Sequence, residues 1–199
     1  MAKKSSHNLI WMDLEMTGLN VDKEVIIEIA TLVTDQELNI IGEGPCLAIH
    51  QKDDILERMD EWNRTTHNAS GLVQKVKTSN IFLQEAEQQT LEFVRKFCPS
   101  KTSPLCGNSI GQDRKFLEKY MPKLHGFLHY RNIDATTIKE LVLRWYPDGP
   151  KPQKKSDAHT AKIDVHESLA ELIFYRKHYF VKGLVGEEEP LLSARESES

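Results

Sequence analysis

Residues 25–33, with the sequence VIIEIATLV, form the stretch that most restricts the possible folds, because it is rich in β-branched side chains. Such a run predicts a well-buried strand. A second run starts at Leu9, alternates after Met12 and predicts a strand over residues 9–17. A third strand is expected over residues 38–50, broken near 42–45. Three strands in succession with short links predict antiparallel neighbours in one sheet.

Helical periodicity dominates the rest of the chain. Ser79 is expected to cap a helix whose apolar residues recur at spacings of three and four up to Phe97. Residues 104–108 predict a short strand, and a helix is expected over about 112–121. Asp134 is expected to cap another helix with Trp145 on its inner face, and a last helix is expected over about 158–178. This order predicts an α/β sheet with helices packed on it, in a single domain over residues 8–180.

Cysteine usage and the distribution of apolar residues indicate the cellular location to expect for the chain. The three cysteines Cys46, Cys98 and Cys106 form no C-x-x-C pair, which favours reduced thiols and argues against a structural zinc site. Residues 1–8 are polar, and no apolar stretch approaches the roughly 18 residues of a membrane span. We therefore expect a cytoplasmic protein; a mitochondrial location, if the source is eukaryotic, would need an import route not visible here. The Glu- and Ser-rich residues 181–199 are expected to be a disordered acidic tail.

The formal net charge of −4 bears on possible nucleic-acid partners. Binding to a long polyanion needs a cation near each neutralised phosphate, so an acidic chain is a poor binder of long strands. A nucleic-acid substrate is therefore expected to be short and held locally. Lys151, Lys154 and Lys155 lie in a loop rich in proline, where they are either solvated or steer a phosphate.

Two patterns of polar residues suggest chemistry, and each occurs more than once. Asp13 and Glu15 share one face of the first predicted strand, and paired carboxylates can hold divalent metals. The same D-x-E pattern occurs at 22–24 and 35–37, so taken alone it also fits a solvated surface pair. His159 and Asp164 form H-x4-D, a spacing that converges only if His159 precedes or begins the helix. That pattern recurs at 129–134.

Asp113 follows Gly107-Asn108-Ser109-Ile110-Gly111 at the start of a predicted helix. An acid in the first turn is favoured by the helix dipole and needs no function. The small residues before it allow a close backbone approach to a ligand. If these acids and His159 converge, they provide the groups to hold two metals and deprotonate a water, which is chemistry that cleaves phosphodiester bonds.

Several ordered segments resemble the oligoribonucleases, members of the DEDD exonuclease superfamily that carry a catalytic histidine. The resemblance covers about residues 8–180 and selects the first D-x-E and the second H-x4-D. It rests on the segments IWMDLEMTGL at 10–19, IIEIA at 26–30, CGNSIGQD at 106–113, HYR at 129–131, and His159 followed by Asp164.

This resemblance implies a ribonuclease H-like fold with a mixed, mostly five-stranded sheet flanked by helices, and it implies a homodimer. It also implies 3′-to-5′ hydrolysis of very short RNAs, above all 5′-phosphorylated dinucleotides, to 5′-mononucleotides. Two Mg²⁺ or Mn²⁺ ions would be the cofactors, and His159 would be the general base. The metal ligands implied by position are Asp13, Glu15, Asp113 and Asp164.

The resemblance also implies roles in substrate binding. Leu19 would wedge between the two bases, and Trp62 would stack on a base. Ser109, Arg131 and Thr136 would cap the 5′ phosphate of the substrate. Tyr130 would reach the active site from the partner subunit.

The sequence departs from the family pattern where an acid commonly precedes the last metal ligand, because Ile163 precedes Asp164 here. We expect activity to survive with the loss of a supporting hydrogen bond. Two alternatives remain. One is an exonuclease of the same superfamily that acts on DNA or long RNA, and the other is a short-RNA binder inactivated at Ile163.

Overall fold

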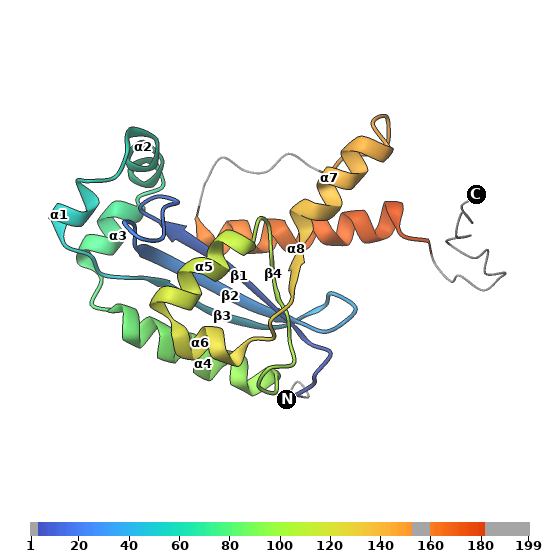
Figure 1. Ribbon diagram of the computed structural model, residues 1–199, viewed down its shortest axis with the longest axis horizontal. Coiled ribbons are helices and arrows are strands. Elements are labelled where there is room, and N and C mark those ends of the chain that lie inside the picture. Colours follow the sequence, from blue (N-terminus) through green and yellow to red (C-terminus); the bar gives the residue numbers. More distant parts are fainter. Residues whose placement is uncertain (1–3, 153–159, 182–199) are drawn as a thin grey trace, which may run out of the picture.

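The computed structural model describes residues 4–152 and 160–181. Within them the chain forms a mixed five-stranded sheet in the order β3-β2-β1-β4-β5, with helices packed against it (Figure 1). Strands β1, β2 and β3 pair antiparallel, whereas β4 and β5 run parallel to β1. The strands are β1 (Leu9–Met16), β2 (Ile26–Thr34), β3 (Ile40–Ala48), β4 (Leu105–Gly107) and β5 (Asn132–Asp134). The helices are α1 (Asp53–Leu56), α2 (Glu61–Ala69), α3 (Leu72–Thr78), α4 (Leu83–Phe97), α5 (Gly111–Tyr120), α6 (Pro122–Phe127), α7 (Ala135–Trp145) and α8 (Ala161–Tyr179).

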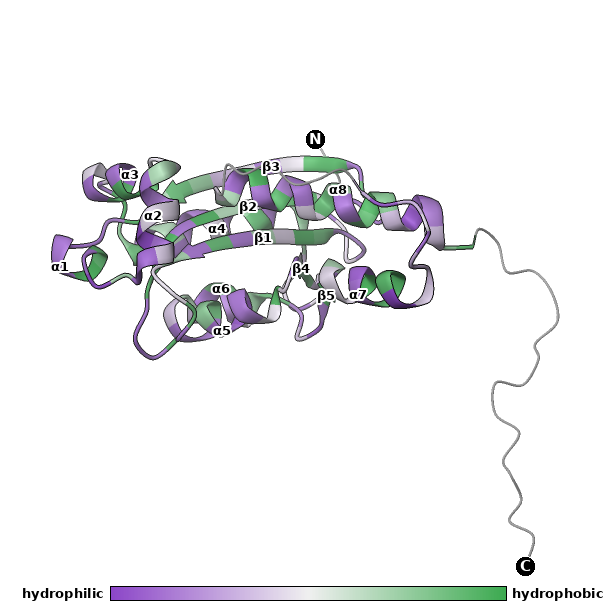
Figure 2. Ribbon diagram, turned by 90° about the horizontal axis from the view of Figure 1, so that it is seen from above, coloured by the Kyte–Doolittle hydropathy of each residue, from purple (hydrophilic) through white to green (hydrophobic). Residues whose placement is uncertain are grey.

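Alternation along β1 sends its side chains into two separate cores. Ile10, Met12 and Leu14 join the large apolar cluster that includes residues of α4, α5 and α6. Trp11 points to the opposite face and packs with residues of α8. The longer helices alternate hydrophilic and hydrophobic residues, as expected for helices with one buried face (Figure 2). Because Asp13 and Glu15 share the face of Trp11, this alternation directs both carboxylates toward α8.

The predicted break in the third strand is wrong. β3 continues through Gly42 and Gly44, although its pairing with β2 shifts register twice. A Cβ atom at Gly42 would lie 2.4 Å from the Phe97 ring, and one at Gly44 would lie 2.6 Å from the Phe93 ring. These glycines let α4 lie close against the strand, so they mark a packing contact and not a chain break.

The predicted helix ends are partly correct. Asp134 caps α7 by accepting a hydrogen bond from the Thr136 amide, as expected. Ser79 does not cap α4, because its hydroxyl donates to the Ala48 carbonyl and accepts from the Ile81 amide. Trp145 is 65% exposed, so its predicted inward position is wrong. The buried stripe of α8 follows the periodic apolar residues of its sequence.

Helices α1, α2 and α3 gather at one end of the sheet (Figure 1). They were not predicted, because residues 53–78 are largely polar and their elements are short. A small apolar cluster joins α1, α3 and the residue Met59 before α2 to β2; its buried members are Ile27, Leu56, Met59, Leu72 and Val76.

All three cysteines are free, in agreement with the expectation of reduced thiols. Among the described residues, none of the helices combines the length and the apolar character that crossing a bilayer requires. The expected acidic tail, apart from Val181, lies outside the described residues, as do Lys154, Lys155 and His159.

Candidate active site

Three carboxylates from distant parts of the sequence meet beside the end of β1. Asp13 and Glu15 come from β1, and Asp164 comes from the first turn of α8. One oxygen of each carboxylate lies within 4.8 Å of the others. The structure therefore brings together the first D-x-E and the acid of the second H-x4-D.

A fourth carboxylate, Glu28, connects this cluster to the start of α8. Glu28 lies opposite Glu15 on β2 and is only 2% exposed. Its Oε2 accepts a hydrogen bond of 3.0 Å from the Ala161 amide, the first residue of α8. A negative charge is favourable at a helix N-terminus, so Glu28 holds α8 where Asp164 can face Glu15.

Asp113 lies beside this group, at the start of α5. Its Oδ1 accepts a hydrogen bond of 3.0 Å from the Leu14 amide, between the two acids of β1. This places the Asp113 side chain against β1, although it does not join the group of three. The burial of the Asp113 carboxyl raises its pKa to about 7, with Asp134 adding to the rise.

The electrostatics of the cluster favour a bound cation. Burial raises the pKa of Glu15 to about 8, and the nearby charges of Asp164, Glu28 and Asp113 add to the rise. Carboxylates that repel one another in a low-dielectric site lose that repulsion when a cation lies between them. Oxygen ligands are also what hard divalent ions such as Mg²⁺ require, so the donor set fits the expected metals.

The repeated patterns elsewhere have structural roles. Glu24 accepts a 2.6 Å hydrogen bond from the Thr17 hydroxyl and so fixes the loop between β1 and β2. Asp35 accepts from the amides of Glu37 and Asn39 in an exposed turn. His159 lies outside the described residues, so its predicted role stays a prediction; Thr160 is the first described residue after that gap and precedes α8.

The carboxylates open into a cleft of about 260 Å³. Two apolar side chains on its wall are unusually exposed: Leu19 is 72% and Trp62 is 66% accessible. Asp60 caps α2 and thereby holds the helix that carries Trp62. The Leu19 carbonyl accepts a 2.5 Å hydrogen bond from Gln112 Nε2. Exposed apolar groups beside a charged cluster are suited to binding flat, apolar faces such as nucleobases.

Ser109 and Thr136 lie together behind Asn108, which lines the cleft. The Ser109 amide donates to Thr136 Oγ1 at 3.0 Å and to Asp134 Oδ1 at 2.9 Å. Their two hydroxyl oxygens are 3.3 Å apart. Ser109 has a φ of 49°, an uncommon conformation for a residue with a side chain, which these contacts stabilise.

Arg131 and Tyr130 form a separate exposed pair. Arg131 Nε donates to the Tyr130 hydroxyl at 3.0 Å, and the Tyr130 side chain is 74% exposed. Tyr130 also packs on the ring of His129. Within residues 4–152 and 160–181, no hydrogen bond joins the Arg131 side chain to Ser109 or Thr136. A single chain therefore brings together two of the three residues expected at the phosphate.

Sequence reasoning missed several polar residues of this region. Glu28 was marked by its position as the one charged residue in the apolar run of β2. His67 lies in α2, with Nδ1 4.0 Å from Glu15 Oε2 and Nε2 3.0 Å from the Met16 carbonyl oxygen. Asn63 also lines the cleft, and Glu171 contacts Asn108 from α8. The pattern of residues around these last three gave no signal, because their positions depend on tertiary contacts.

Comparison with known protein families identifies the class of this domain. The exonuclease family RNase_T matches residues 10–172, which is most of the chain. The chain belongs to this exonuclease family.

Its relatives within the family are more specific. It is 59% identical to the oligoribonuclease of Marinobacter nauticus over 172 residues, covering 86% of this chain and 96% of the relative. It is 53% identical to the oligoribonuclease of Pseudomonas aeruginosa strain PAO1 over 176 residues, covering 88% of this chain and 98% of the relative. The chain is thus a member of the oligoribonuclease group, as its motifs suggested.

Solved structures confirm the fold at much lower identity. Exonuclease I from Methylocaldum szegediense superposes with a TM-score of 0.67 at 17% identity, covering 86% of this chain and 41% of that one. Escherichia coli exonuclease I in complex with a dT13 oligonucleotide gives 0.68 at 15% identity, with the same coverage. The chain spans about two fifths of these longer structures. The predicted α/β, ribonuclease H-like fold is confirmed.

Proposed function

We propose that this protein is a 3′-to-5′ exoribonuclease that hydrolyses short oligoribonucleotides, especially 5′-phosphorylated dinucleotides, to 5′-mononucleotides. The observation that carries the proposal is the meeting of Asp13, Glu15 and Asp164 in a cleft that also exposes Leu19 and Trp62. The cleft is small, and the relatives that match nearly their whole length to this chain are named oligoribonucleases.

Asp13, Glu15, Asp113 and Asp164 would hold two Mg²⁺ or Mn²⁺ ions. When bound, such ions lower the pKa of a water and stabilise the charge on a leaving oxygen in phosphodiester hydrolysis. Asp113 already holds the Leu14 amide with one oxygen, so its other oxygen is the candidate ligand. His159 would accept the proton of the attacking water, a step worth about 10²–10⁴ in rate.

The walls of the cleft would select the substrate. Leu19 would insert between two bases and Trp62 would stack on one of them, an interaction worth about 1–3 kcal/mol per base. Ser109, Thr136 and Arg131 would contact the 5′ phosphate. A strand that continues past a capped 5′ phosphate has no room in such a pocket, which explains a preference for dinucleotides.

The homodimer belongs to this proposal, with Tyr130 reaching the site of the partner subunit. The exposure of Tyr130 in the single chain supports it, because a ring that is 74% accessible is available for such a contact. Because Arg131 donates a hydrogen bond to the Tyr130 hydroxyl, the Arg131 side chain would enter the partner's site beside Tyr130. The cytoplasmic location stays a prediction.

The test is turnover of a 5′-phosphorylated diribonucleotide with Mn²⁺ and then with EDTA, beside the same bases within a 20-mer. We expect fast cleavage of the dinucleotide alone, and none in EDTA. Equal or faster cleavage of the 20-mer would favour an exonuclease for long strands. Binding of the dinucleotide without cleavage in Mn²⁺ would favour a short-RNA binder inactivated at Ile163.

A further inference from the structure

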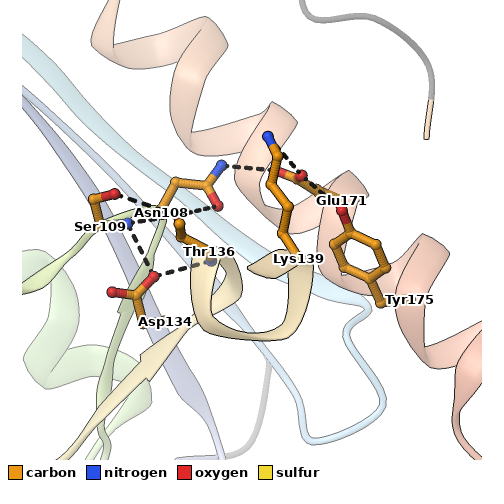
Figure 3. A network of polar contacts seen from close by, with 7 residues as sticks. All are labelled: Asn108, Ser109, Asp134, Thr136, Lys139, Glu171 and Tyr175. Atoms are coloured by element: carbon orange, nitrogen blue, oxygen red, sulfur yellow. Dashed lines mark hydrogen bonds and ion pairs between the residues drawn. The ribbon is translucent and has the colours of Figure 1, made fainter. Parts of the chain in front are cut away.

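Glu171 is a buried acid of α8 whose carboxylate contacts Asn108, Tyr175 and Lys139, beyond the carboxylate cluster. It is 5% exposed. Its Oε2 accepts a hydrogen bond of 3.0 Å from Asn108 Nδ2 (Figure 3). Its Oε1 accepts from the Tyr175 hydroxyl at 3.0 Å and lies 3.4 Å from Lys139 Nζ. Burial and the neighbouring Glu171 charge raise the pKa of Tyr175, so its hydroxyl keeps its proton and acts as a donor.

These contacts fix which way the Asn108 amide faces. An ionised carboxylate only accepts hydrogen bonds, so it must meet the NH₂ of Asn108 and not the carbonyl oxygen. The Asn108 carbonyl oxygen is thereby turned toward Thr136, whose Oγ1 donates to it at 3.3 Å (Figure 3). The hydrogen of the Thr136 hydroxyl is therefore committed to Asn108.

The hydrogen-bond direction set at Asn108 also determines which atoms donate and which accept between Thr136 and Ser109. With its hydrogen committed, Thr136 Oγ1 acts as an acceptor, and it accepts from the Ser109 amide at 3.0 Å. Thr136 cannot then donate to Ser109 Oγ, 3.3 Å away. In this contact between the two hydroxyls Ser109 Oγ is therefore the donor, and its hydrogen can turn instead to a phosphate oxygen placed beside it.

We propose that Glu171 is a positioning residue for the 5′ phosphate: through Asn108 and Thr136 it sets the hydrogen-bond direction that makes the Ser109 hydroxyl the donor to that phosphate. The inference deepens the proposed function and rests on it. Glu171 does not touch the substrate, so its effect should appear in the preference for a 5′ phosphate.

The experiment replaces Glu171 by Gln and compares kcat/KM for a 5′-phosphorylated diribonucleotide with kcat/KM for its 5′-hydroxyl form. A Gln side chain accepts at its oxygen only, and Lys139 beside Oε1 can only donate, so the Gln oxygen should stay at Lys139 and Tyr175. Its NH₂ then faces Asn108, which reverses the hydrogen-bond direction along Asn108 and Thr136. Hydrogen bonds to charged groups are among the stronger ones, so we expect the ratio of the two values to fall about tenfold. Glu140→Gln, the same change in an exposed ion pair on α7, should leave the ratio within twofold.

A double substitution separates positioning from general damage. If Glu171 acts through Ser109, then Ser109→Ala combined with Glu171→Gln should lower the ratio no further than Ser109→Ala alone. A purely structural role predicts additive losses. Should Glu171→Gln fail to fold, Asn108→Ala interrupts the same path, and the same loss of the ratio is expected.

Three outcomes decide the matter. A parent protein that shows no metal-dependent cleavage, or no preference for a 5′ phosphate, overturns the proposed function and this inference with it. A parent that prefers the 5′ phosphate while Glu171→Gln keeps the parental ratio overturns the inference alone. A tenfold loss that is absent on the Ser109→Ala background supports it.

Discussion

The alternating residues of the eight-residue strand β1 give its two faces opposite purposes. Toward α4, α5 and α6, the strand presents Ile10, Met12 and Leu14, which are at most 5% exposed. Toward α8, it presents Trp11 and then Asp13 and Glu15. One face gains free energy by burying apolar surface, whereas the other brings like charges together. The difference shows that the strand can hold a repulsive cluster because its other face anchors it.

The cluster face also depends on supports that the apolar face does not need. Glu28 accepts from the start of α8, and Asp113 accepts from the Leu14 amide. Both contacts fix backbone atoms next to candidate ligands. The apolar face is specified by shape and volume, while the acidic face is specified by hydrogen-bond direction. Substitutions on the two faces should therefore change different measured quantities.

The largest effect is expected from Glu15→Gln on the acidic face. Loss of one candidate ligand should lower turnover of the dinucleotide at least a hundredfold, because the proposed metals would supply most of the charge stabilisation. The melting temperature of the metal-free protein at pH 8 should rise, since the change removes a buried carboxylate whose neighbours repel it. Glu37→Gln, the same change in an exposed D-x-E pair, is the control, and equal losses in both variants would contradict the assignment.

Met12→Ala tests the apolar face of the same strand. The Met12 side chain is fully buried, so its truncation should lower the free energy of unfolding by about 2–5 kcal/mol. Turnover per folded molecule should stay within threefold of the parent, because the side chain points away from the carboxylates. Urea unfolding and single-turnover assays measure the two quantities, with the exposed Ile40→Ala on β3 as a control. A Met12→Ala enzyme that is stable but inactive would mean that the two faces are not separable.

The apolar face was also the easier one to predict from the sequence. Alternation along residues 9–17 and the β-branched run of β2 predicted both strands to within one residue at each end. The break expected at Gly42 was wrong because the sequence cannot show that a Phe97 ring fills the space beside it. Short polar helices such as α2 were missed because tertiary contacts, and not propensity, stabilise them.

The acidic face needed more than the pattern of residues. Each D-x-E and each H-x4-D pattern is ambiguous alone. Only the longer segments shared with the oligoribonucleases distinguished Asp13 and Asp164 from the acids of the repeated patterns. The roles of Glu28 and Glu171 in the site depend on the atom that donates a hydrogen bond to each carboxylate from a distant part of the chain. Such directions arise from packing between elements more than 60 residues apart in the chain, so no local pattern encodes them.

The last prediction concerns the pH dependence of the stability of the metal-free protein. The pKa of Glu15 is raised from 4.5 to about 8, so between these values the folded state holds a proton that the unfolded state has lost. Stability therefore falls as pH rises through this window, by up to about 1.4 kcal/mol per pH unit for one such group. Asp113, with its pKa raised from 3.8 to about 7, acts in the same direction at lower pH.

We expect the melting temperature of the metal-free protein to fall by several degrees between pH 5 and pH 8. Added Mn²⁺ should raise it more at pH 8 than at pH 6, because a metal binds the deprotonated carboxylates and competes with protons. Differential scanning calorimetry with and without EDTA measures both trends. The Glu15→Gln variant lacks the titrating group, so its melting temperature should fall less over the same range. An equal fall in the variant and the parent would place the origin of the pH dependence outside the acidic face of β1.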